Sequence, residues 1–387
     1  MVLHVAAVSG SRADFGPLRP LLEGLRDDPR TRLSTVVCAV GAAAEAERQV
    51  EAFALAGIEL TERVLPSVAA EGGTSASMPA QAARALEGVS AALQRIGPDV
   101  VVLLGDRFEI LAAAMGAHLL RIPIVHLSGG DETLGSLDDA MRHAISRLAS
   151  LHFPTNAEAG RRLRSLGLMP DRIEVAGSTA LDALVAFTPL SRGKVAVELD
   201  TDLDGPIVAV TYHPATQADE PPAATMRSLL AGVREAAPEA RIVITGSNAD
   251  EGGTVIDAAA RELARTDPRL VFVPSLGVER YWSLLHHADA VVGNSSSALI
   301  EAPVVGVPVV DVGERQASRL RAESCIHAEA DQGSIAAAVR EALSRPRRPE
   351  ASPYGDGRAV PRILDRLAGL ADPRALLEPR PLPPVPA

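Results

Sequence analysis

The chain has 387 residues, of which 47% are hydrophobic and 22% are charged. At about 150 residues per domain this length predicts two or three domains, and the composition excludes a disordered chain. The formal net charge of −11 disfavours attraction to nucleic acid or to an anionic membrane surface, so we expect neither as a partner. An anionic ligand would then be held by a local cluster of basic residues.

The cysteine usage and the hydropathy predict a soluble cytoplasmic protein. Cys38 and Cys325 lie far apart and form no CxxC pair, which is typical of a reduced intracellular protein. No apolar run reaches the roughly 18 residues of a membrane span. The N-terminal segment leads directly into a strand-like run and lacks the pattern of a signal peptide.

Short apolar runs of strand length alternate with stretches of helical periodicity in two blocks. The first block contains Val2–Val8, Ser34–Val40, Val100–Leu104, Ile124–Leu127 and Ile173–Val175. The second block contains Ile207–Val210, Ile242–Thr245, Leu270–Val273, Ala290–Val292 and Val309–Val312. This alternation is typical of parallel sheets that are covered by helices on both faces.

The blocks meet at a run rich in helix and strand breakers, residues 189–205, which we predict to be a linker. The sequence thus predicts an α/β fold with two doubly wound domains, residues 1–188 and 206–370, and a cleft between them. Residues 371–387 are predicted to form a Pro-rich tail.

Ligands bind at the carboxyl ends of strands in such sheets, so polar residues that directly follow a strand are the candidates for a site. Arg12, which can pair with phosphate, and Asp14 follow the first run. Asp106 and Arg107 follow the third run, where the guanidinium would hold the carboxylate ionised, as a general base requires. A strand-to-helix turn with a surface arginine and a structural ion pair are the alternatives.

A double-glycine loop with Ser128 and Asp131 follows the fourth run, and a helical pattern then carries Asp138 and Arg142 one turn apart. Carboxylates in the first turn of this helix could face a ligand and transfer protons. A capping box is the alternative, and it accounts for the neighbouring Asp139 better than for Asp138.

His213 follows the first strand-like run of the second block, where it could contact a charged ligand or pass protons. A packing or capping histidine is the alternative. The nine histidines include no HxH or HExxH spacing, so the sequence predicts no metal site.

The strongest local pattern is GNSSSALIE, residues 293–301, which predicts a helix that ends near Gly306. Small hydroxyl residues at a helix N-terminus leave backbone N–H groups free to bind phosphate. Glu301 could accept hydrogen bonds from both hydroxyls of a ribose, and Arg315 could reach a diphosphate. N-capping alone would explain the serines but neither the glutamate nor the arginine. The candidate nucleotide residues are therefore Gly293, Ser295, Ser296, Glu301 and Arg315.

Taken in order, segments along nearly the whole chain resemble the hydrolysing UDP-N-acetylglucosamine 2-epimerases, which begin sialic acid synthesis. The segments are GSRADFGPLRP, GDRFEILAAA, HLSGGDETLGSLDDAMRHAISRLASLHF, VTYHPAT, SNADEGG, GNSSSALIEAPVVGVPVVDVGERQ and PYGDGRAVPRIL. The resemblance implies two Rossmann-like domains in a GT-B arrangement, a UDP-sugar substrate in the cleft, no metal or other cofactor, and a homodimer or tetramer.

The resemblance also implies a reaction and roles for the candidates. The C2 proton is removed while UDP leaves by anti elimination, and water then adds to the 2-acetamidoglucal with inversion at C2, which releases N-acetylmannosamine. UDP would be held by Arg12, Ser295, Ser296, Glu301 and Arg315, and acid–base or sugar contacts would come from Asp106, Asp138 and His213, with Arg107 beside them. We add Asp131 as a catalytic candidate and Asp14, Ser128, Arg142 and Gly293 as substrate-binding candidates.

One position departs from the family pattern, which usually has a glutamate, one of the acid–base candidates, where this chain has Ser128. A serine cannot take up a proton as a carboxylate does. Either Asp131 or Asp106 takes over this role, or the substrate is a related UDP-sugar such as a 2,4-diacetamido-trideoxyhexose, or turnover is impaired. We expect an active enzyme, because the other acidic positions are retained.

Other functions share these features. A GT-B glycosyltransferase would have the same nucleotide residues without needing the carboxylates Asp106 and Asp138, and a nucleotide-sugar binding protein would perform no chemistry. A non-hydrolysing epimerase of the same fold would return UDP-N-acetylmannosamine.

Overall fold

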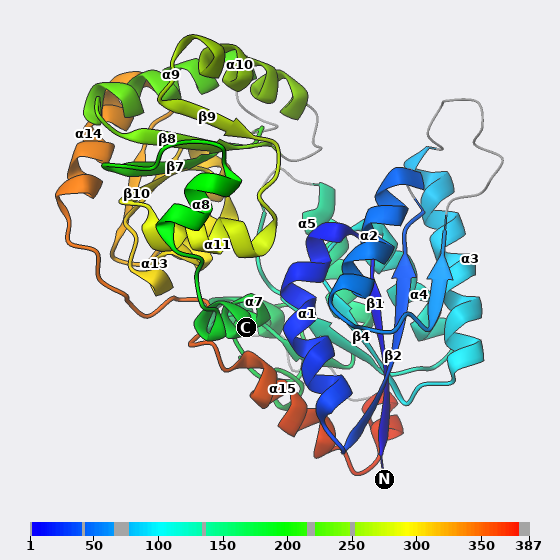
Figure 1. Cartoon of the computed structure of the whole chain (residues 1–387). Coiled ribbons are helices and arrows are strands. Elements are labelled where there is room, and N and C mark those ends of the chain that lie inside the picture. The colour runs from blue at the N-terminus through cyan, green and yellow to red at the C-terminus, as the bar shows by residue number, and fades with distance from the viewer. Residues whose placement is uncertain are drawn as a thin grey trace. The chain divides into compact units, whose positions relative to one another are not determined.

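The computed structural model describes residues 2–40, 43–65, 77–133, 137–214, 221–247 and 252–378, without the side chains of residues 12, 13 and 43–45. Contacts between Cα atoms divide the chain into two units (Figure 1). The first holds nearly all of the chain up to Ala183 together with the C-terminal segment from Tyr354, and the second extends from Leu184 to Pro353.

The first unit is a six-stranded parallel sheet in the order β3-β2-β1-β4-β5-β6. Its elements are β1 (Leu3–Ser9), α1 (Arg12–Asp27), β2 (Thr31–Cys38), α2 (Ala43–Leu55), β3 (Glu62–Val64), α3 (Met78–Ile96), β4 (Val100–Leu104), α4 (Phe108–Leu119), β5 (Ile124–Leu127), α5 (Leu137–Leu148), β6 (Leu151–Phe153), α6 (Ala157–Ser165), η2 (Pro170–Arg172), α15 (Ala359–Ala368) and η4 (Pro373–Leu377). Helix α7 (Thr179–Ala186) crosses the boundary between the units.

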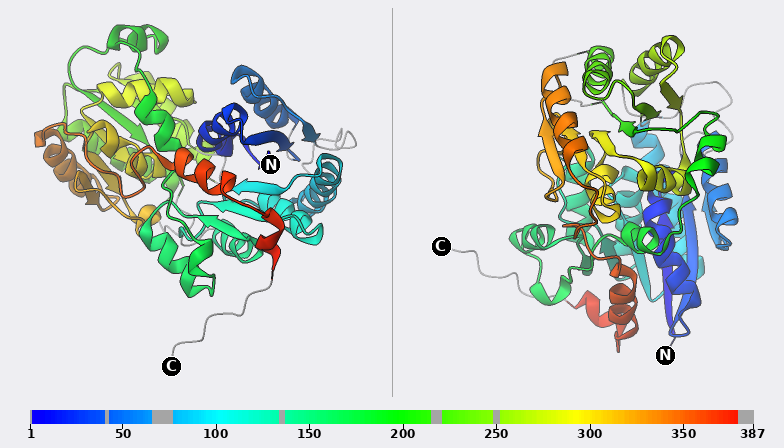
Figure 2. Two further views of the ribbon diagram at one scale, coloured as in Figure 1. Left: turned by 90° about the horizontal axis from the view of Figure 1, so that it is seen from below. Right: turned by 60° about the vertical axis from the view of Figure 1, so that its left-hand side comes forward.

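This sheet is buried on both faces, which explains its continuous apolar strands. All five residues of β4 are buried. Because side chains alternate along a strand, Val102 packs with Leu21 of α1 on one face, whereas Val101 packs with Val89 of α3 on the other. Helices therefore cover both faces, as Figure 1 and the two views of Figure 2 show.

The second unit is another six-stranded parallel sheet, in the order β12-β11-β10-β7-β8-β9. Its elements are α8 (Arg192–Glu198), β7 (Ile207–Thr211), α9 (Pro222–Ala236), β8 (Arg241–Thr245), α10 (Gly253–Thr266), β9 (Leu270–Val273), α11 (Gly277–His287), β10 (Ala290–Gly293), α12 (Ser296–Ile300), α13 (Ala302–Val305), β11 (Val309–Val312), η3 (Glu314–Gln316), β12 (Cys325–Ala328) and α14 (Gln332–Ser344). Apolar residues of α9, α10 and α14 form one core with the strands.

Both sheets have the strand order of a Rossmann fold, so the predicted fold class of two doubly wound α/β units is confirmed. In such a sheet the chain winds outward in both directions from two central strands. These strands are β1 and β4 in the first unit and β7 and β10 in the second. Ligands bind outside the carboxyl ends of this central pair.

The C-terminal segment belongs to the first unit, whereas the sequence predicted that most of it belongs to the second. The second domain was expected to continue to residue 370, but α15 packs against α1 of the first unit, as Figures 1 and 2 show. The apolar face of α15, with Ile363 and Leu367, joins the core of that unit. Asp182 accepts hydrogen bonds from the first N–H groups of this helix, those of Ala359 and Val360, at 2.9 and 2.8 Å.

Three further expectations differ in detail. The run Ile173–Val175 is no strand and forms only an isolated bridge to His152. The predicted linker contains α8, whose first turn is capped by the Ser191 hydroxyl, which accepts a hydrogen bond from Lys194 N. The short edge strands β3, β6 and β12 were not predicted, because runs of three or four residues carry little periodicity.

Candidate active site

The first group of candidates lies at the carboxyl ends of β1 and β4. Asp14 lies in the first turn of α1, directly after β1, and Asp106 directly follows β4. The two strands are hydrogen-bonded neighbours, with Val8 opposite Leu103 near their ends. The fold therefore brings together carboxylates that are 92 residues apart in the sequence, since 106 − 14 = 92.

Arg142 of α5 holds the carboxylate of Asp106. The guanidinium donates a hydrogen bond from Nη2 to Asp106 Oδ2, and the side chain of Arg142 is only 6% exposed. Nη1 donates to the carbonyl oxygen of Asp131 at 2.8 Å and to Oδ1 of Asp139 at 3.2 Å. Asp106 thus has a fixed orientation and a compensating positive charge, which suits a carboxylate that accepts a proton.

Arg107 lies among carboxylates. Its Nε and Nη2 each donate to a different oxygen of Glu109 at 3.2 Å, and the Glu109 side chain is almost fully buried. Burial lowers the pKa of Arg107, but the carboxylates of Glu109, Asp14 and Asp138 outweigh this effect and raise it. Arg107 is therefore a fixed cation whose side chain remains 44% exposed to solvent.

Asp14 is buried, whereas the other candidate carboxylates of this group are only partly buried. Its Oδ2 accepts a hydrogen bond from Ser11 N at 2.8 Å, at the N-terminus of α1. Burial raises the pKa of Asp14 to about 7, and this effect exceeds the lowering by the Ser11 hydrogen bond and by Arg107. Asp14 can therefore exchange a proton near neutral pH.

The loop after β5 carries both Ser128 and Asp131. The Asp131 carboxylate accepts hydrogen bonds from Thr155 Oγ1 at 3.1 and 3.2 Å and from Asn156 Nδ2 at 3.3 Å. Ser128 has a left-handed backbone, with φ of 60°. Its backbone N–H donates to Phe153 O at 3.0 Å, so the neighbouring strand β6 holds this turn.

Some candidates are only partly described. Helix α1 begins at Arg12, but the side chain of Arg12 lies outside the described residues. The serine of the expected capping box, residue 136, lies outside them as well. Asp138 is half-buried in the first turn of α5. Its neighbour Asp139 forms an ion pair with Arg142, so this carboxylate has a role other than capping the helix.

The second group lies at the carboxyl ends of β7 and β10, and Gly293 allows these strands to approach. Its φ is 143°, and a Cβ at this position would overlap the carbonyl oxygen of Thr211. The side chain of Asn294 then ties the strand ends together. Its Oδ1 accepts from His213 N at 2.7 Å, and its Nδ2 donates to His213 O at 2.9 Å.

Two polar pairs connect α12 to α11. The hydroxyls of Ser295 and Ser297 are 2.9 Å apart, and Ser297 is 3.0 Å from the phenol oxygen of Tyr281. One turn after Ser297, Glu301 accepts a hydrogen bond at its Oε2 from Nε1 of Trp282 at 3.0 Å. Burial raises the pKa of Glu301 to about 7, although the Trp282 hydrogen bond acts in the opposite direction.

Arg315 adds a positive charge to this group. Its Nη1 donates to the carbonyl oxygen of Asn294 at 3.0 Å, and Gln316 donates to the same oxygen at 2.9 Å. Burial, and to a lesser extent Arg315, lowers the pKa of His213 to about 3. At neutral pH His213 is therefore an uncharged ring beside a cation.

The expected helix after the serines is interrupted. Helix α12 covers Ser296–Ile300 and is followed by the separate turn α13 instead of continuing to Gly306. Pro303 lacks the N–H that would continue the helical hydrogen bonds. The half-buried Ser296 begins α12, so the serines contribute hydroxyl groups and one helical turn rather than the end of a long helix.

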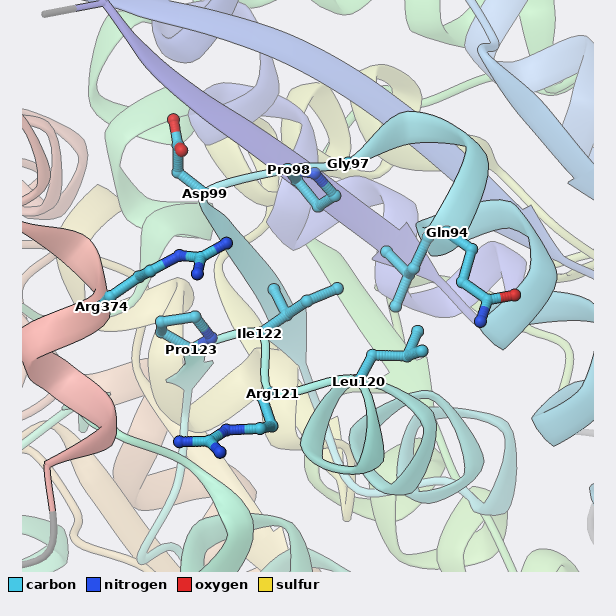
Figure 3. A pocket seen from close by; sticks show the side chains of 10 residues that line it. Gln94, Gly97, Pro98, Asp99, Leu120, Arg121, Ile122, Pro123 and Arg374 are labelled. Atoms are coloured by element: carbon cyan, nitrogen blue, oxygen red, sulfur yellow. The ribbon is translucent and has the colours of Figure 1, made fainter.

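A cavity of about 240 Å³ lies elsewhere in the first unit (Figure 3). It is bordered by the residues that precede β4 and β5, such as Asp99 and Pro123, and by Arg374. This is the amino end of the sheet, and no candidate residue borders the cavity. The candidate residues lie at the opposite, carboxyl ends of the strands.

Three residues that hold the candidates in place were not predicted from the sequence, namely Glu109, Trp282 and His126. His126 is fully buried, its pKa is lowered to about 4 by burial, and its Nε2 lies 3.0 Å from Gly105 O. Only Glu109 carried a signal, because it follows Asp106 and Arg107 in the same motif. Trp282 lies in an ordinary amphipathic pattern.

Comparison with known proteins identifies the family. The sequence profile described as UDP-N-acetylglucosamine 2-epimerase matches residues 24–368. The UDP-N,N'-diacetylbacillosamine 2-epimerase (hydrolyzing) of Legionella pneumophila is 31% identical over 374 residues, or 95% of this chain and 96% of the relative. The GDP/UDP-N,N'-diacetylbacillosamine 2-epimerase (hydrolyzing) of Campylobacter jejuni is also 31% identical, over 84% of each chain.

Among solved structures, the UDP-GlcNAc 2-epimerase from Neisseria meningitidis bound to UDP-GlcNAc has a TM-score of 0.77 and 18% sequence identity, and the match covers 94% of this chain and 99% of that chain. This likeness confirms the predicted GT-B fold class. Within its described residues, this structure contains no helix that is long and apolar enough to span a membrane. The profile match and the two relatives show that the chain belongs to the UDP-N-acetylglucosamine 2-epimerase family.

Proposed function

We propose that this protein is a hydrolysing 2-epimerase of a UDP-linked 2-acetamido sugar. The observation that carries the proposal is that each Rossmann-like unit has a polar group at its central strand pair. One group has carboxylates ordered by arginines, and the other has hydroxyls, a carboxylate and an arginine. A sugar that loses a proton and a nucleotide that leaves as an anion need these two kinds of group.

The second unit holds the uridine nucleotide in this proposal. Glu301 accepts hydrogen bonds from the ribose hydroxyls, while the hydroxyls of Ser295 and Ser296 and the guanidinium of Arg315 contact the diphosphate. Gly293 is needed for the close approach of the strands that carry these residues. Arg12 supplies a second cation to the diphosphate, since the net charge of the chain offers no general attraction for an anion.

The first unit acts on the sugar. Asp106 or Asp138 takes the C2 proton, the C1–O bond breaks as UDP leaves with its electron pair, and a C1–C2 double bond forms. Water then adds its hydroxyl at C1 and a proton at C2 on the opposite face, which inverts that centre. Arg107 contacts the sugar, and Asp14 of the first unit and His213 of the second assist a proton transfer or a sugar contact.

The C2 hydrogen is barely acidic, so a carboxylate alone is too weak a base. Removal of the proton becomes feasible when it is concerted with departure of a leaving group whose developing charge is neutralised. Arg315 and Arg12 provide this neutralisation in the proposal. Arg142 keeps Asp106 oriented, so that the base needs little reorganisation.

Two relatives named for UDP-N,N'-diacetylbacillosamine favour a 2,4-diacetamido sugar as the preferred substrate over UDP-N-acetylglucosamine. The serine at position 128 is in accord with this preference, because a site for a different sugar can place its proton-transfer groups differently. Asp131 remains the other carboxylate near this position. We further propose a homo-oligomer, which light scattering of the purified protein checks.

The deciding experiment incubates the protein with either UDP-sugar in deuterated water, without an acceptor, and follows the products by NMR. The proposal requires free UDP, a free amino sugar with inverted C2, and deuterium at C2. A UDP-linked epimer would indicate a non-hydrolysing enzyme. Binding without exchange at C2 would indicate a nucleotide-sugar binding protein, and turnover only with an added acceptor would indicate a glycosyltransferase.

A further inference from the structure

The only tryptophan of the chain contacts the carboxylate that we assign to the nucleotide ribose. Trp282 donates its indole N–H to Oε2 of Glu301 at 3.0 Å. Within the described part of the chain, the other carboxylate oxygen, Oε1, has no hydrogen-bond donor. The two oxygens are therefore not equivalent, because one is occupied by the protein and the other is available to a ligand.

The indole itself is held in place. Its ring makes an edge-on contact with Phe187, with ring centroids 5.4 Å apart and an interplanar angle of 65°, and only 6% of Trp282 is exposed. The preceding residue of α11, Tyr281, contacts Ser297, which lies one turn before Glu301. Two neighbouring residues of α11 thus reach two positions of the segment that carries the nucleotide candidates.

The Trp282 hydrogen bond favours the charged form of Glu301, but burial has the larger effect on its pKa. Burial raises its pKa to about 7, so the carboxyl group is poorly solvated before a ligand arrives. An indole N–H is a fixed donor that cannot accept a proton or rotate to another acceptor. A donor of this kind orients a carboxylate without supplying a competing charge.

We infer that Trp282 is a positioning residue for nucleotide recognition, which binds one oxygen of Glu301 and thereby directs the other toward the ribose hydroxyls of the substrate. This inference rests on the proposed role of Glu301 in nucleotide binding. It assigns to Trp282 an effect on affinity and on sugar-hydroxyl discrimination, and no effect on the chemical step. It also makes the single indole a reporter, since a nucleotide bound at Glu301 changes the surroundings of that indole.

The test compares the affinity of the full-length protein for UDP and for 2′-deoxy-UDP by calorimetry, in the wild type and in W282F. Phenylalanine keeps an aromatic ring but removes the donor. Wild-type protein should bind UDP about tenfold more tightly than the deoxynucleotide, and W282F should lose most of this ratio. KM for the UDP-sugar should rise about tenfold while kcat changes less than twofold. Tryptophan fluorescence of the wild type should shift on titration with UDP.

F187L is the matched control, because it removes the ring contact of Trp282 but leaves the indole N–H in place. It should keep the discrimination even if the melting temperature falls. If W282F discriminates as the wild type does while E301Q does not, the inference about Trp282 is overturned and the proposed function stands. If the wild type binds both nucleotides equally or neither, the proposed role of Glu301 fails as well.

Discussion

Arg142 and Asp106 form an ion pair between residues 36 positions apart, and their side chains are 6% and 23% exposed. The same guanidinium also binds the carbonyl oxygen of Asp131 and the carboxylate of Asp139. One arginine therefore connects the ends of β4 and β5 with α5. Its planar, five-donor geometry is what allows three acceptors to be held at once.

Replacement of Arg142 should damage both activity and stability. R142M leaves the carboxylate of Asp106 without its donor in a poorly solvated place, so we expect a loss of about 3 kcal/mol of unfolding free energy and at least a hundredfold fall in kcat. R142K restores the charge but not the fork of donors, and it should recover stability more than kcat. Urea denaturation and steady-state rates measure the two effects.

R161M is the control for that experiment, because Arg161 is an exposed arginine on α6. It should change the free energy of unfolding by less than about 0.5 kcal/mol. Equal effects of R142M and R161M would contradict the assignment of Arg142 as the support of Asp106.

A variant at position 128 tests whether the enzyme needs a carboxylate at this position. S128E introduces a carboxylate at a residue whose φ of 60° is equally unfavourable for serine and for glutamate. In our proposal the proton goes to Asp106 or Asp138, so S128E should change kcat by less than about tenfold. The variant that removes this base, D106N or D138N, should lower kcat by about a thousandfold or more. Complete loss of activity of S128E on both UDP-sugars would show that our account of this position is wrong.

Gly293 should tolerate no side chain. A Cβ there would overlap the carbonyl oxygen of Thr211, and the φ of 143° is open only to glycine. G293A is expected to cost about 3 kcal/mol or more of unfolding free energy. G193A is a matched control in α8, where a Cβ meets nothing within 4 Å, and it should stabilise by about 0.5–1 kcal/mol.

The sequence was sufficient to predict the strands that carry the candidates. The runs Val100–Leu104, Ile124–Leu127 and Val309–Val312, which candidate residues follow, are strands with those bounds. Fully buried parallel strands consist of continuous apolar residues, and this pattern is local. The sequence alone therefore places the polar residues that follow such strands at one edge of a sheet.

The remaining features depend on contacts that have no local signal. Helix α15 follows the second sheet in the chain but joins the core of the first unit through Ile363 and Leu367. Its amphipathic spacing indicates a buried face, but not which core buries it. The pairing of Trp282 with Glu301 and that of Arg142 with Asp106 likewise depend on the packing of helices far apart in the sequence.

Asp14 should make the protein less stable as the pH rises. Its pKa is raised from 3.8 to about 7 by burial, so between these values the unfolded chain releases a proton that the folded chain retains. Stability attributable to this residue is full below about pH 4, falls as the pH increases, and reaches its minimum above about pH 7. The complete effect is of the order of 4 kcal/mol.

D14N removes this ionisation, so the difference in unfolding free energy between D14N and the wild type should shift in favour of the variant between about pH 4 and pH 8. Chemical denaturation across this range measures it. D204N, at an exposed aspartate, should show no such trend. A difference for D14N that does not vary with pH would contradict the buried, protonated state.

Glu301 should give nucleotide binding a pH dependence of the opposite sense. Its pKa is raised to about 7, and the ionised form is the one that accepts hydrogen bonds from two ribose hydroxyls. The groups that face it do not titrate in this range, because Trp282 does not ionise and burial raises the pKa of Tyr281 further above its usual value. His213, in the same group of candidates, is uncharged well above its pKa of about 3.

The affinity for a UDP-sugar should therefore rise with pH up to about 7 and then become constant, with a change of about tenfold per pH unit on the acidic side. A UDP-sugar is preferred to UDP for this measurement because its diphosphate has no ionisation near neutral pH. Calorimetry on the inactive variant, D106N or D138N, avoids turnover during the titration. Adding E301Q to that variant should give weaker binding without this slope, because an amide does not ionise, and an unchanged slope would assign the titration to another group.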